Sequence, residues 1–217
     1  MYRESGTVVC FCGARSTLSN LAPYQLTIRL HEATDTTPPR DVHFNSSEHA
    51  YQWTKLHFLG LHQEADWIFR HESPMAAMQG AKAEIGVHVR GLRRKDPQAA
   101  SALEDRIQLW RNHRAEDVLE DLAIRKAKAY PHFAALLLRN NGKRFVEATP
   151  DKHWGCGFPT HKVQTMSDRE LLATMPGQNR MGQILTAVAS TWHDYTEVNG
   201  PFEGTLRAHV KFSSLIQ

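Results

Sequence analysis

Helix-start signatures in the middle of the chain are the feature that most constrains its fold. Ser73 and Pro74 open the segment "ESPMAAMQGAKAEIG", and Asp96 and Pro97 open "KDPQAASALEDRIQLW" in the same way. Ser and Asp side chains accept hydrogen bonds from the first free N–H groups of a helix, and proline fits the first helical position because it has no N–H to satisfy. A run rich in Ala, Leu and charged residues follows until Pro131 interrupts it. The centre of the chain is therefore predicted to be a series of helices.

Shorter segments on either side predict further helices and a few strands. Helices are expected over residues 45–58, 64–70, 131–140 and 179–192. Strands are expected over residues 7–12, 25–30, 41–44 and 144–149, with one more around "LRAHVKF", while "HEATDTTPPR" and "PDKHWGCGFPTHK" are expected to be loops. This pattern predicts an α+β fold, a single mostly helical domain with a few strands contributed from both ends of the chain. We expect the domain to cover residues 1–192 and residues 193–217 to be a C-terminal extension.

The composition is that of an ordinary globular protein. With 217 residues, 41% of them hydrophobic and 23% charged, the chain is long enough to bury a core. No stretch approaches the ~18 uninterrupted apolar residues of a membrane span, and "MYRESGTVVCFCG" lacks the layout of a secretory signal. The three cysteines have no framework spacing, so we expect a cytoplasmic protein.

Charge and histidine content predict neither a nucleic-acid groove nor a metal centre. The net charge is +3, and the tightest basic run, residues 90–95, is short enough to be a solvated loop or helix end. His49, His57 and His62 do not share a helical face, and no paired metal-ligand motif occurs. We therefore expect no metal and no cofactor.

The segment "NSSEHAYQWTKLHF" places one carboxylate, Glu48, near an expected helix start. With Asn45 as the cap, Glu48 is the third helical residue, from which a carboxylate can reach back to the N–H of the cap. Its negative charge also suits the positive end of the helix dipole. On local sequence alone, a role in starting the helix explains Glu48.

The residues that share a helical stripe with Glu48 allow a second interpretation. Tyr51, Gln52 and Lys55 follow it at i+3, i+4 and i+7. A stabilising exposed face would place a lysine at i+4, where Gln52 stands instead. An acid, an aromatic ring, an amide and a cation on one stripe can also line a cleft, so both interpretations stay open at this level.

Six blocks of the sequence, in order, resemble the NADAR superfamily, also called YbiA-like. "FNSSEHAYQWTKL" is similar to its "SEH-aromatic-Q-x-x-K" signature, "LSNLAP" to its "FSNF" segment and "SPMAAMQGAK" to its "SP-x-x-A-x-x-xGR" helix. Trp110 with the helix after it, "FVEATPDKHWGCG" and "GQNRMGQIL" resemble three further blocks. The resemblance extends over residues 11–189, most of the chain.

Departures from the family pattern bear on the site. Ala81 and Lys82 stand where the family has "GR", so a phosphate contact there is expected to be lost or shifted. Leucines replace the usual aromatic residues in "LSNL". The stretch "FPTHKVQTMSDRELLATMP" lengthens the connection to Asn179 and can form a lid, and the residues after Thr191 have no counterpart.

The resemblance implies a metal-independent N-glycosidase that acts on a ribosylated base. Activities described for the family include removal of ADP-ribose from guanine and cleavage of phosphoribosyl intermediates of riboflavin synthesis. The resemblance further implies that Glu48 and Asp151 are the catalytic carboxylates. The implied substrate-binding residues are Asn20, Tyr51, Gln52, Lys55, Trp110, Trp154, Gly155, Asn179 and Arg180.

This chemistry needs a carboxylate beside the anomeric carbon. Breaking a ribosyl C1′–N bond passes through a transition state resembling an oxocarbenium ion, and a carboxylate can stabilise its charge, orient a water or attack directly. A nearby helix N-terminus would keep Glu48 ionised, which favours a base or nucleophile over an acid. Asp151 can hold the ribose hydroxyls or assist the leaving base, and its structural alternative is an Asx-turn after Pro150.

Aromatic and basic candidates also have two interpretations. An indole can stack on a flat base, but Trp110 lies in an amphipathic helix and is equally well explained as core. Trp154 lies in a glycine-rich loop without the apolar periodicity that would bury it. Lys55 and Arg180 can contact phosphates, or they can be solvated surface charges.

The expected ligand is an ADP-ribosylated guanine, either in a nucleotide or in nucleic acid. The mildly basic charge favours an ADP-ribosyl substrate over a phosphoribosyl metabolite, and it leaves the oligomeric state open. The alternative from another functional class is a module that binds ADP-ribose or a nucleotide without hydrolysing it. Glu48 and Asp151 favour the enzyme, because a binder of anionic phosphates has less use for nearby carboxylates.

Overall fold

The computed structural model describes residues 1–30 and 40–199, and the chain divides into two compact units. The terminal unit comprises residues 1–22 and 123–199, and the central unit comprises residues 23–30 and 40–122. Helix α5 (Ala115–Ala129) begins in the central unit and ends in the terminal unit. The strand expected around "LRAHVKF" lies outside the described residues. No helix within the described ranges is long and apolar enough to cross a membrane.

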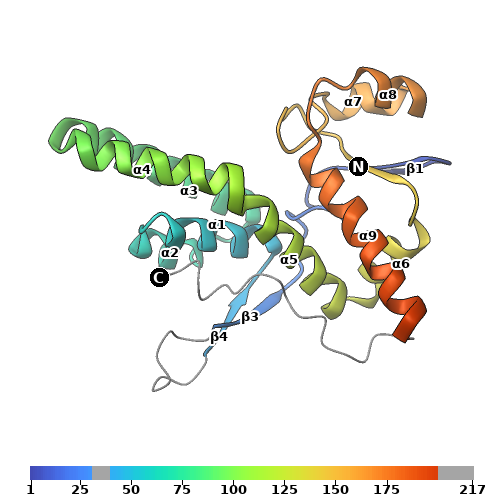
Figure 1. Cartoon of the computed structure of the whole chain (residues 1–217), viewed down its shortest axis with the longest axis horizontal. Coiled ribbons are helices and arrows are strands. Elements are labelled where there is room, and N and C mark those ends of the chain that lie inside the picture. Colours follow the sequence, from blue (N-terminus) through green and yellow to red (C-terminus); the bar gives the residue numbers. More distant parts are fainter. Residues whose placement is uncertain (31–39, 200–217) are drawn as a thin grey trace. The chain divides into compact units, whose positions relative to one another are not determined.

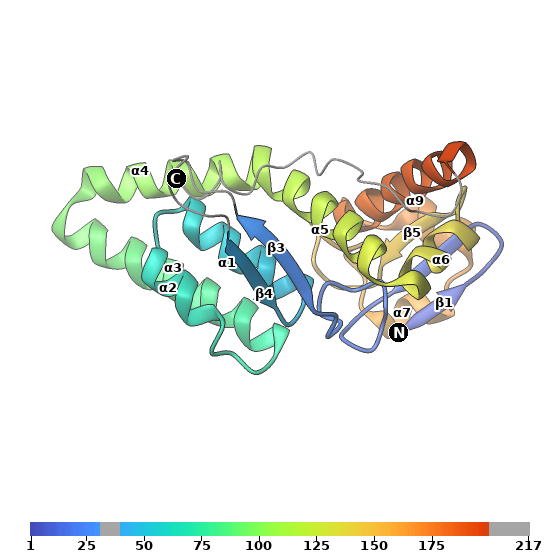
Figure 2. The same cartoon turned by 90° about the horizontal axis from the view of Figure 1, so that it is seen from below.

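The central unit packs a β-hairpin against helices. Its elements are β3 (Leu26–Leu30), β4 (Arg40–Phe44), α1 (Ser47–Phe58), α2 (His62–Ile68), α3 (Pro74–Lys95), α4 (Pro97–Leu109) and a π-helical turn (Trp110–Arg114). Strands β3 and β4 pair antiparallel beside α1 (Figure 2), with Ile28 opposite Val42. The rings of Phe44 and Trp53 meet edge to face at 5.5 Å, and both side chains are buried. This apolar contact fixes α1 on the hairpin.

The two predicted helix starts of this unit are confirmed. Ser73 Oγ accepts a hydrogen bond from the N–H of Ala76 at 3.1 Å, and Asp96 Oδ1 accepts one from the N–H of Ala99 at 3.0 Å. Helices α3 and α4 then run antiparallel beside each other (Figure 1). The basic run at the end of α3 is exposed, as its interpretation as a solvated helix end predicts, and Arg93 pairs there with Glu104 at 2.6 Å.

The terminal unit brings strands from distant parts of the chain into one sheet. Its elements are β1 (Tyr2–Glu4), β2 (Val8–Phe11), α6 (Pro131–Arg139), β5 (Arg144–Glu147), α7 (Thr160–Thr165), α8 (Asp168–Thr174) and α9 (Arg180–Asn199). The strand order is β1-β2-β5, with β1 antiparallel and β5 parallel to β2. The predicted contribution of strands from both ends of the chain is therefore confirmed. Strand β1 was not predicted, because "YRE" has no apolar alternation.

Helix α9 packs closely on strand β5 because of one glycine. A Cβ atom on Gly182 would collide with the carbonyl oxygen of Phe145 and with the side chain of Asn179. Glycine therefore lets the first turn of α9 approach the strand. The asparagine and the second glycine of the "GQNRMG" block thus act together in this contact.

The connection that the sequence predicts to be a loop or a lid instead forms α7 and α8, which pack into the terminal unit. Val163 and Leu171 are fully buried against Val8, Cys10 and neighbouring apolar side chains. Burial of these residues makes the segment part of the core, so the lid interpretation is wrong.

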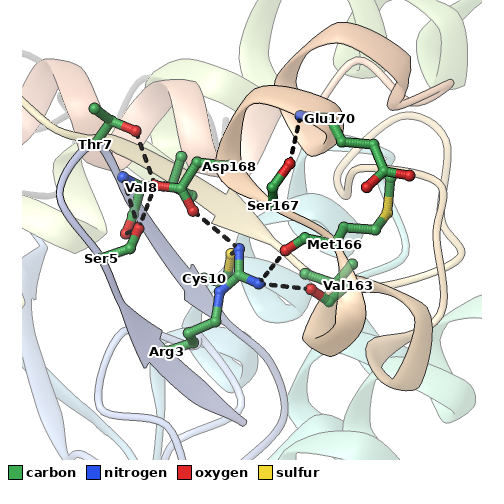
Figure 3. Close-up of polar contacts among 10 residues, drawn as sticks. All are labelled: Arg3, Ser5, Thr7, Val8, Cys10, Val163, Met166, Ser167, Asp168 and Glu170. Atoms are coloured by element: carbon green, nitrogen blue, oxygen red, sulfur yellow. Dashed lines mark hydrogen bonds and ion pairs between the residues drawn. The ribbon is translucent and has the colours of Figure 1, made fainter.

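Polar contacts fasten the same segment to the N-terminal strands (Figure 3). Asp168 accepts hydrogen bonds from Ser5 Oγ at 2.5 Å and Thr7 Oγ1 at 2.8 Å. The Arg3 guanidinium lies 3.3 Å from Asp168 Oδ1, and its Nη1 donates to the carbonyls of Val163 and Met166, each at 2.8 Å. These partners lower the pKa of Asp168, chiefly through the hydrogen bond from Ser5.

Replacing Leu171 with alanine is expected to destabilise the protein. Its side chain is fully buried, and truncation leaves a cavity, so the free energy of unfolding should fall by about 2–5 kcal/mol. Urea denaturation measures this change. Leu109→Ala is the matched control, because Leu109 is 47% exposed and should change stability by only about 0.5 kcal/mol. Equal small effects from both substitutions would contradict the packing of α8 into the core.

Candidate functional site

Helix α1 begins one residue later than the sequence predicts. Ser46, not Asn45, is the cap: its backbone is extended and its hydroxyl accepts a hydrogen bond from the N–H of His49 at 3.2 Å. Glu48 is consequently the second helical residue and does not reach back to the cap. The capping-box part of the helix-starting interpretation is therefore wrong, while the place of Glu48 in the first turn still suits the helix dipole.

His49 fixes this helix start, a role that sequence reasoning did not assign. One ring nitrogen lies 2.8 Å from Ser46 Oγ, and the other lies 3.1 Å from the carbonyl oxygen of His71. The ring is buried and joins the start of α1 to the end of the α2 region. The histidine of the "SEH" signature thus orients the turn that carries Glu48.

Glu48 is a nearly buried carboxylate with one hydrogen bond given by the structure. It is 9% exposed, and its Oε1 accepts a hydrogen bond from Gln52 Nε2 at 2.7 Å. Burial raises the pKa of Glu48, while the Gln52 hydrogen bond and the charge of Lys55 oppose that rise. This direction is opposite to the one expected from the helix N-terminus. The protonated form of Glu48 is therefore more accessible near neutral pH than that of an exposed glutamate.

Tyr51 and Trp110 form a buried pair beside this carboxylate. The indole N–H of Trp110 donates to Tyr51 Oη at 3.1 Å, and the ring centroids lie 5.6 Å apart. Trp110 is 2% exposed and also contacts the Phe58 ring at 5.4 Å, so it is core in this structure, as its alternative interpretation holds. Burial raises the pKa of Tyr51, which keeps its hydroxyl protonated.

The π-helical turn that begins at Trp110 was not predicted. Such turns insert one residue into a helical run and are frequent at functional sites. Here the turn buries Trp110 while Arg111, the next residue, stays exposed. The sequence signal, a change in apolar spacing within one long helical run, is weak.

Lys55 lies within electrostatic range of Glu48, and two further cations from separate elements lie within range of Lys55. Burial lowers the pKa of Lys55 on α1, and the positive charges of Arg111 in the π-helical turn and Lys82 on α3 lower it further. The negative charge of Glu48 opposes this shift. Lys82, the departure from the family "GR", therefore lies within electrostatic range of the predicted site. Within residues 40–122, the structure gives none of the three cations an ion pair with a carboxylate. A gathering of like charges without a carboxylate in an ion pair is suited to an anionic ligand.

The predicted residues of the terminal unit hold a loop together. Asp151 Oδ1 accepts hydrogen bonds from the N–H groups of His153 and Trp154, both at 2.7 Å, which is the Asx-turn alternative. Trp154 is half-buried and meets the His153 ring edge-on at 4.6 Å. Gly155 has no room for a side chain, because a Cβ atom would collide with Thr149 Oγ1.

Asn179 fastens the start of α9 to β5. Its side chain accepts from the N–H of Glu147 and donates to the carbonyl of Phe145, both at 2.9 Å, and it is 4% exposed. Its φ of 53° lies in the left-handed region, which asparagine tolerates better than most residues. These contacts give Asn179 a structural role, and a substrate contact by it stays a prediction.

The first two N–H groups of α9 are already used within the protein. The N–H of Arg180 donates to the carbonyl of His153, and the N–H of Met181 donates to that of Trp154, both at 3.1 Å. The Arg180 guanidinium lies 3.4 Å from the side-chain oxygens of Gln178 and Gln183. Any phosphate contact at this position therefore has to come from the side chain.

A buried lysine positions the loop that carries Asn20. Lys126 Nζ donates to the carbonyls of Thr17 and Ser19 at 2.5 and 3.1 Å and lies 4.6 Å from the centre of the Phe133 ring. Asn20 Nδ2 in turn lies 3.2 Å from Met181 Sδ. Sequence reasoning missed Lys126, although a lysine between buried positions of "LAIRKAKAY" is the available signal.

The stability of the protein is expected to rise between pH 7 and pH 10 because of Lys126. Burial lowers its pKa to about 7 in the folded state, from 10.5 for an exposed lysine. Between these values the unfolded chain binds more protons than the folded one, so raising the pH favours folding. Thermal unfolding at several pH values measures this rise, and Lys126→Met should flatten it. A wild-type profile as flat as that of Lys126→Met would contradict the low pKa.

No three His, Cys, Asp or Glu side chains cluster as metal ligands anywhere in the described ranges. The sequence matches no curated protein. The solution NMR structure of the E. coli protein YbiA has a similar fold, with a TM-score of 0.54 over 94% of this chain and 95% of that one. The two sequences are 18% identical, so the likeness concerns the fold alone. The NADAR domain matches residues 10–191, including parts of both compact units. From its motifs, its fold and this match, the chain belongs to the NADAR family.

Proposed function

We propose that this chain is an N-glycosidase that hydrolyses the N-ribosidic bond of an ADP-ribosylated guanine, in a nucleotide or in nucleic acid. The observation that carries the proposal is the position of Glu48, a nearly buried carboxylate within electrostatic range of Lys55, which in turn has Lys82 and Arg111 within its range. A carboxylate stabilises the positive charge that develops on ribose, and cations hold the phosphates attached to that ribose. Residues of the central unit offer both kinds of group, which supports the proposal.

The number of cations favours a diphosphate over a single phosphate. Lys55, Lys82 and Arg111 come from α1, α3 and the π-helical turn, so they can contact separate phosphate oxygens. ADP-ribose carries two linked phosphates, whereas a phosphoribosyl intermediate of riboflavin synthesis carries one. The phosphoribosyl substrate is the second candidate, and the substitution of Lys82 for the family arginine is compatible with either.

Two roles in the terminal unit stay predictions. Asp151 has a second carboxylate oxygen beyond the one used in its turn, and it is the candidate to assist the leaving base. The half-buried indole of Trp154 is the candidate to stack on that base. Asp151→Asn tests the first role, because it keeps a turn-forming side chain and removes the charge.

A binding module without hydrolysis has one observation in its favour. Burial raises the pKa of Glu48, and a protonated Glu48 would not repel phosphates. If the protein were such a module, Glu48→Gln would bind ADP-ribose as well as the wild type does and no substrate would be cleaved.

The test is a substrate panel analysed by chromatography. It comprises ADP-ribosylated guanine nucleotides and DNA, NAD, ADP-ribose and pyrimidine phosphoribosyl intermediates, each incubated with wild type and Glu48→Gln. We expect the wild type to release ADP-ribose from the modified guanine substrates and Glu48→Gln to release none at a comparable rate. Cleavage of only the phosphoribosyl compounds would support the second candidate. Binding without cleavage would support the module.

A further inference from the structure

The Glu48–Gln52 pair has one end unsatisfied. Both side chains are buried, at 9% and 5% exposed, and Gln52 Nε2 donates to Glu48 Oε1 at 2.7 Å. The other end of the amide, Gln52 Oε1, is buried and has no hydrogen-bond partner among the described residues. A buried acceptor without a partner is destabilising, so its presence next to the candidate catalytic group needs an explanation.

A primary amide can serve a carboxyl group in either protonation state. Ionised Glu48 only accepts hydrogen bonds, and the NH₂ end of Gln52 supplies one. Protonated Glu48 carries an O–H donor, and the free Gln52 Oε1 can accept from it once the amide turns over. The pair therefore keeps one hydrogen bond whether or not the proton is present.

The charged and aromatic neighbours are less suited to this role. Lys55 only donates hydrogen bonds when charged, and the Tyr51 hydroxyl is engaged by the Trp110 indole, which donates to it. The neighbouring His49 ring is occupied by Ser46 and His71. Gln52, by contrast, is hydrogen-bonded to the Glu48 carboxyl group, and its amide has both a donor and an acceptor end.

The geometry points to Gln52 as a positioning residue whose amide turns over to match the protonation state of Glu48. In this arrangement Glu48 acts as a general base toward water and not as a covalent nucleophile. This inference rests on the proposed function. A water oxygen bonds to C1′ while the C1′–N bond breaks and its electron pair leaves with the base. The water proton passes to Glu48, the Gln52 amide turns over, and the proton then passes to the departing nitrogen. The products are a ribose hydroxyl and a protonated base, and Glu48 returns to its ionised form.

The first test needs no substrate. Carbon-13 NMR of side-chain carboxyl groups gives the titration midpoint of Glu48, and Glu48→Gln identifies its signal. Gln52→Met removes the hydrogen bond to the ionised form, so the Glu48 midpoint should move up by about one pH unit. Gln108→Met, on an exposed position of α4, is the matched control and should leave the midpoint unchanged. An unmoved midpoint in Gln52→Met would overturn the inference.

A second variant keeps the test valid if Gln52→Met fails to fold. Gln52→Glu preserves size and polarity and creates two adjacent carboxyl groups that share one proton. One midpoint of the pair should then rise well above that of Glu48 in the wild type. Two carboxyl groups with ordinary midpoints would show that the side chains are not in contact.

Kinetics separate positioning from substrate binding. We expect Gln52→Met to lower kcat and move the acid limb of the kcat/KM profile to higher pH, with KM changed by less than about threefold. A raised KM with an unmoved acid limb would make Gln52 a substrate-binding residue instead. A ribosyl adduct on Glu48, found by mass spectrometry of protein quenched during turnover, would overturn the general-base role. Absence of any turnover would count against the proposed function, while the NMR titration would still decide the role of Gln52.

Discussion

Replacing Glu48 with glutamine is expected to lower kcat/KM on an ADP-ribosylated guanine nucleotide by about 100-fold or more. A positioned general base contributes about 10²- to 10⁴-fold, and the amide can neither take a proton nor offset the charge on ribose. Folding should survive, because the substitution removes the cost of burying a carboxylate that is 9% exposed. Steady-state kinetics and thermal unfolding of the same preparation measure both effects.

The matched control for this substitution is Glu72→Gln. Glu72 is exposed and lies in the same unit, so its replacement changes the net charge by the same amount without touching the site. Its activity should stay within about twofold of the wild type. Equal activity of Glu48→Gln and Glu72→Gln would remove Glu48 from the mechanism.

Neutralising the cations near Lys55 is expected to weaken substrate binding. A hydrogen bond to a charged group contributes about 1.5–3 kcal/mol, so Lys82→Gln and Arg111→Gln should each raise KM for the ADP-ribosyl substrate by about tenfold to hundredfold. Both side chains are exposed, so the fold should tolerate the changes. The wild-type KM should also rise with salt concentration, because screening weakens these contacts.

Arg94→Gln is the control for the cations. Arg94 lies in the exposed last turn of α3, and its neutralisation should leave KM within about twofold. If Lys82→Gln, Arg111→Gln and Arg94→Gln all lowered affinity equally, the effect would come from the net charge of the protein. The proposed diphosphate contact would then be wrong.

Local signals predicted most of the secondary structure. The Ser73–Pro74 and Asp96–Pro97 starts formed as expected, since a cap and a first-turn proline act within a few residues of each other. Strand β1 and helices α7 and α8 were missed because their stability comes from distant partners. Arg3 holds residues more than 150 positions away, and no local pattern encodes that contact.

The candidate site was predictable as a stripe but not in its environment. Glu48 and Gln52 were placed on one helical face from their spacing, and the structure joins them by a hydrogen bond. The cap was misplaced by one residue because Asn45 and Ser46 are both good caps, and only the backbone conformation distinguishes them. The raised pKa of Glu48 depends on burial by several elements, which sequence spacing does not contain.

The family motifs of the terminal unit include residues that stabilise the fold of this unit. Asn179 and Gly182 let α9 pack on β5, and Asp151 closes a turn through backbone N–H groups. A motif match alone cannot separate such roles from substrate contacts, because both restrict which residue a position accepts. Lys126 was missed for a different reason, since its role depends on the carbonyls of Thr17 and Ser19, which the block around Lys126 does not encode.

We expect Glu48 to direct water to the anomeric carbon of a ribosylated base. The most direct test of this role is to incubate wild-type protein with an ADP-ribosylated guanine nucleotide in water enriched in oxygen-18. Mass spectrometry then measures the masses of the products. We predict ADP-ribose that carries one heavy oxygen, together with an unlabelled guanine nucleotide. Intact substrate after prolonged incubation, or label on the guanine product, would contradict the account.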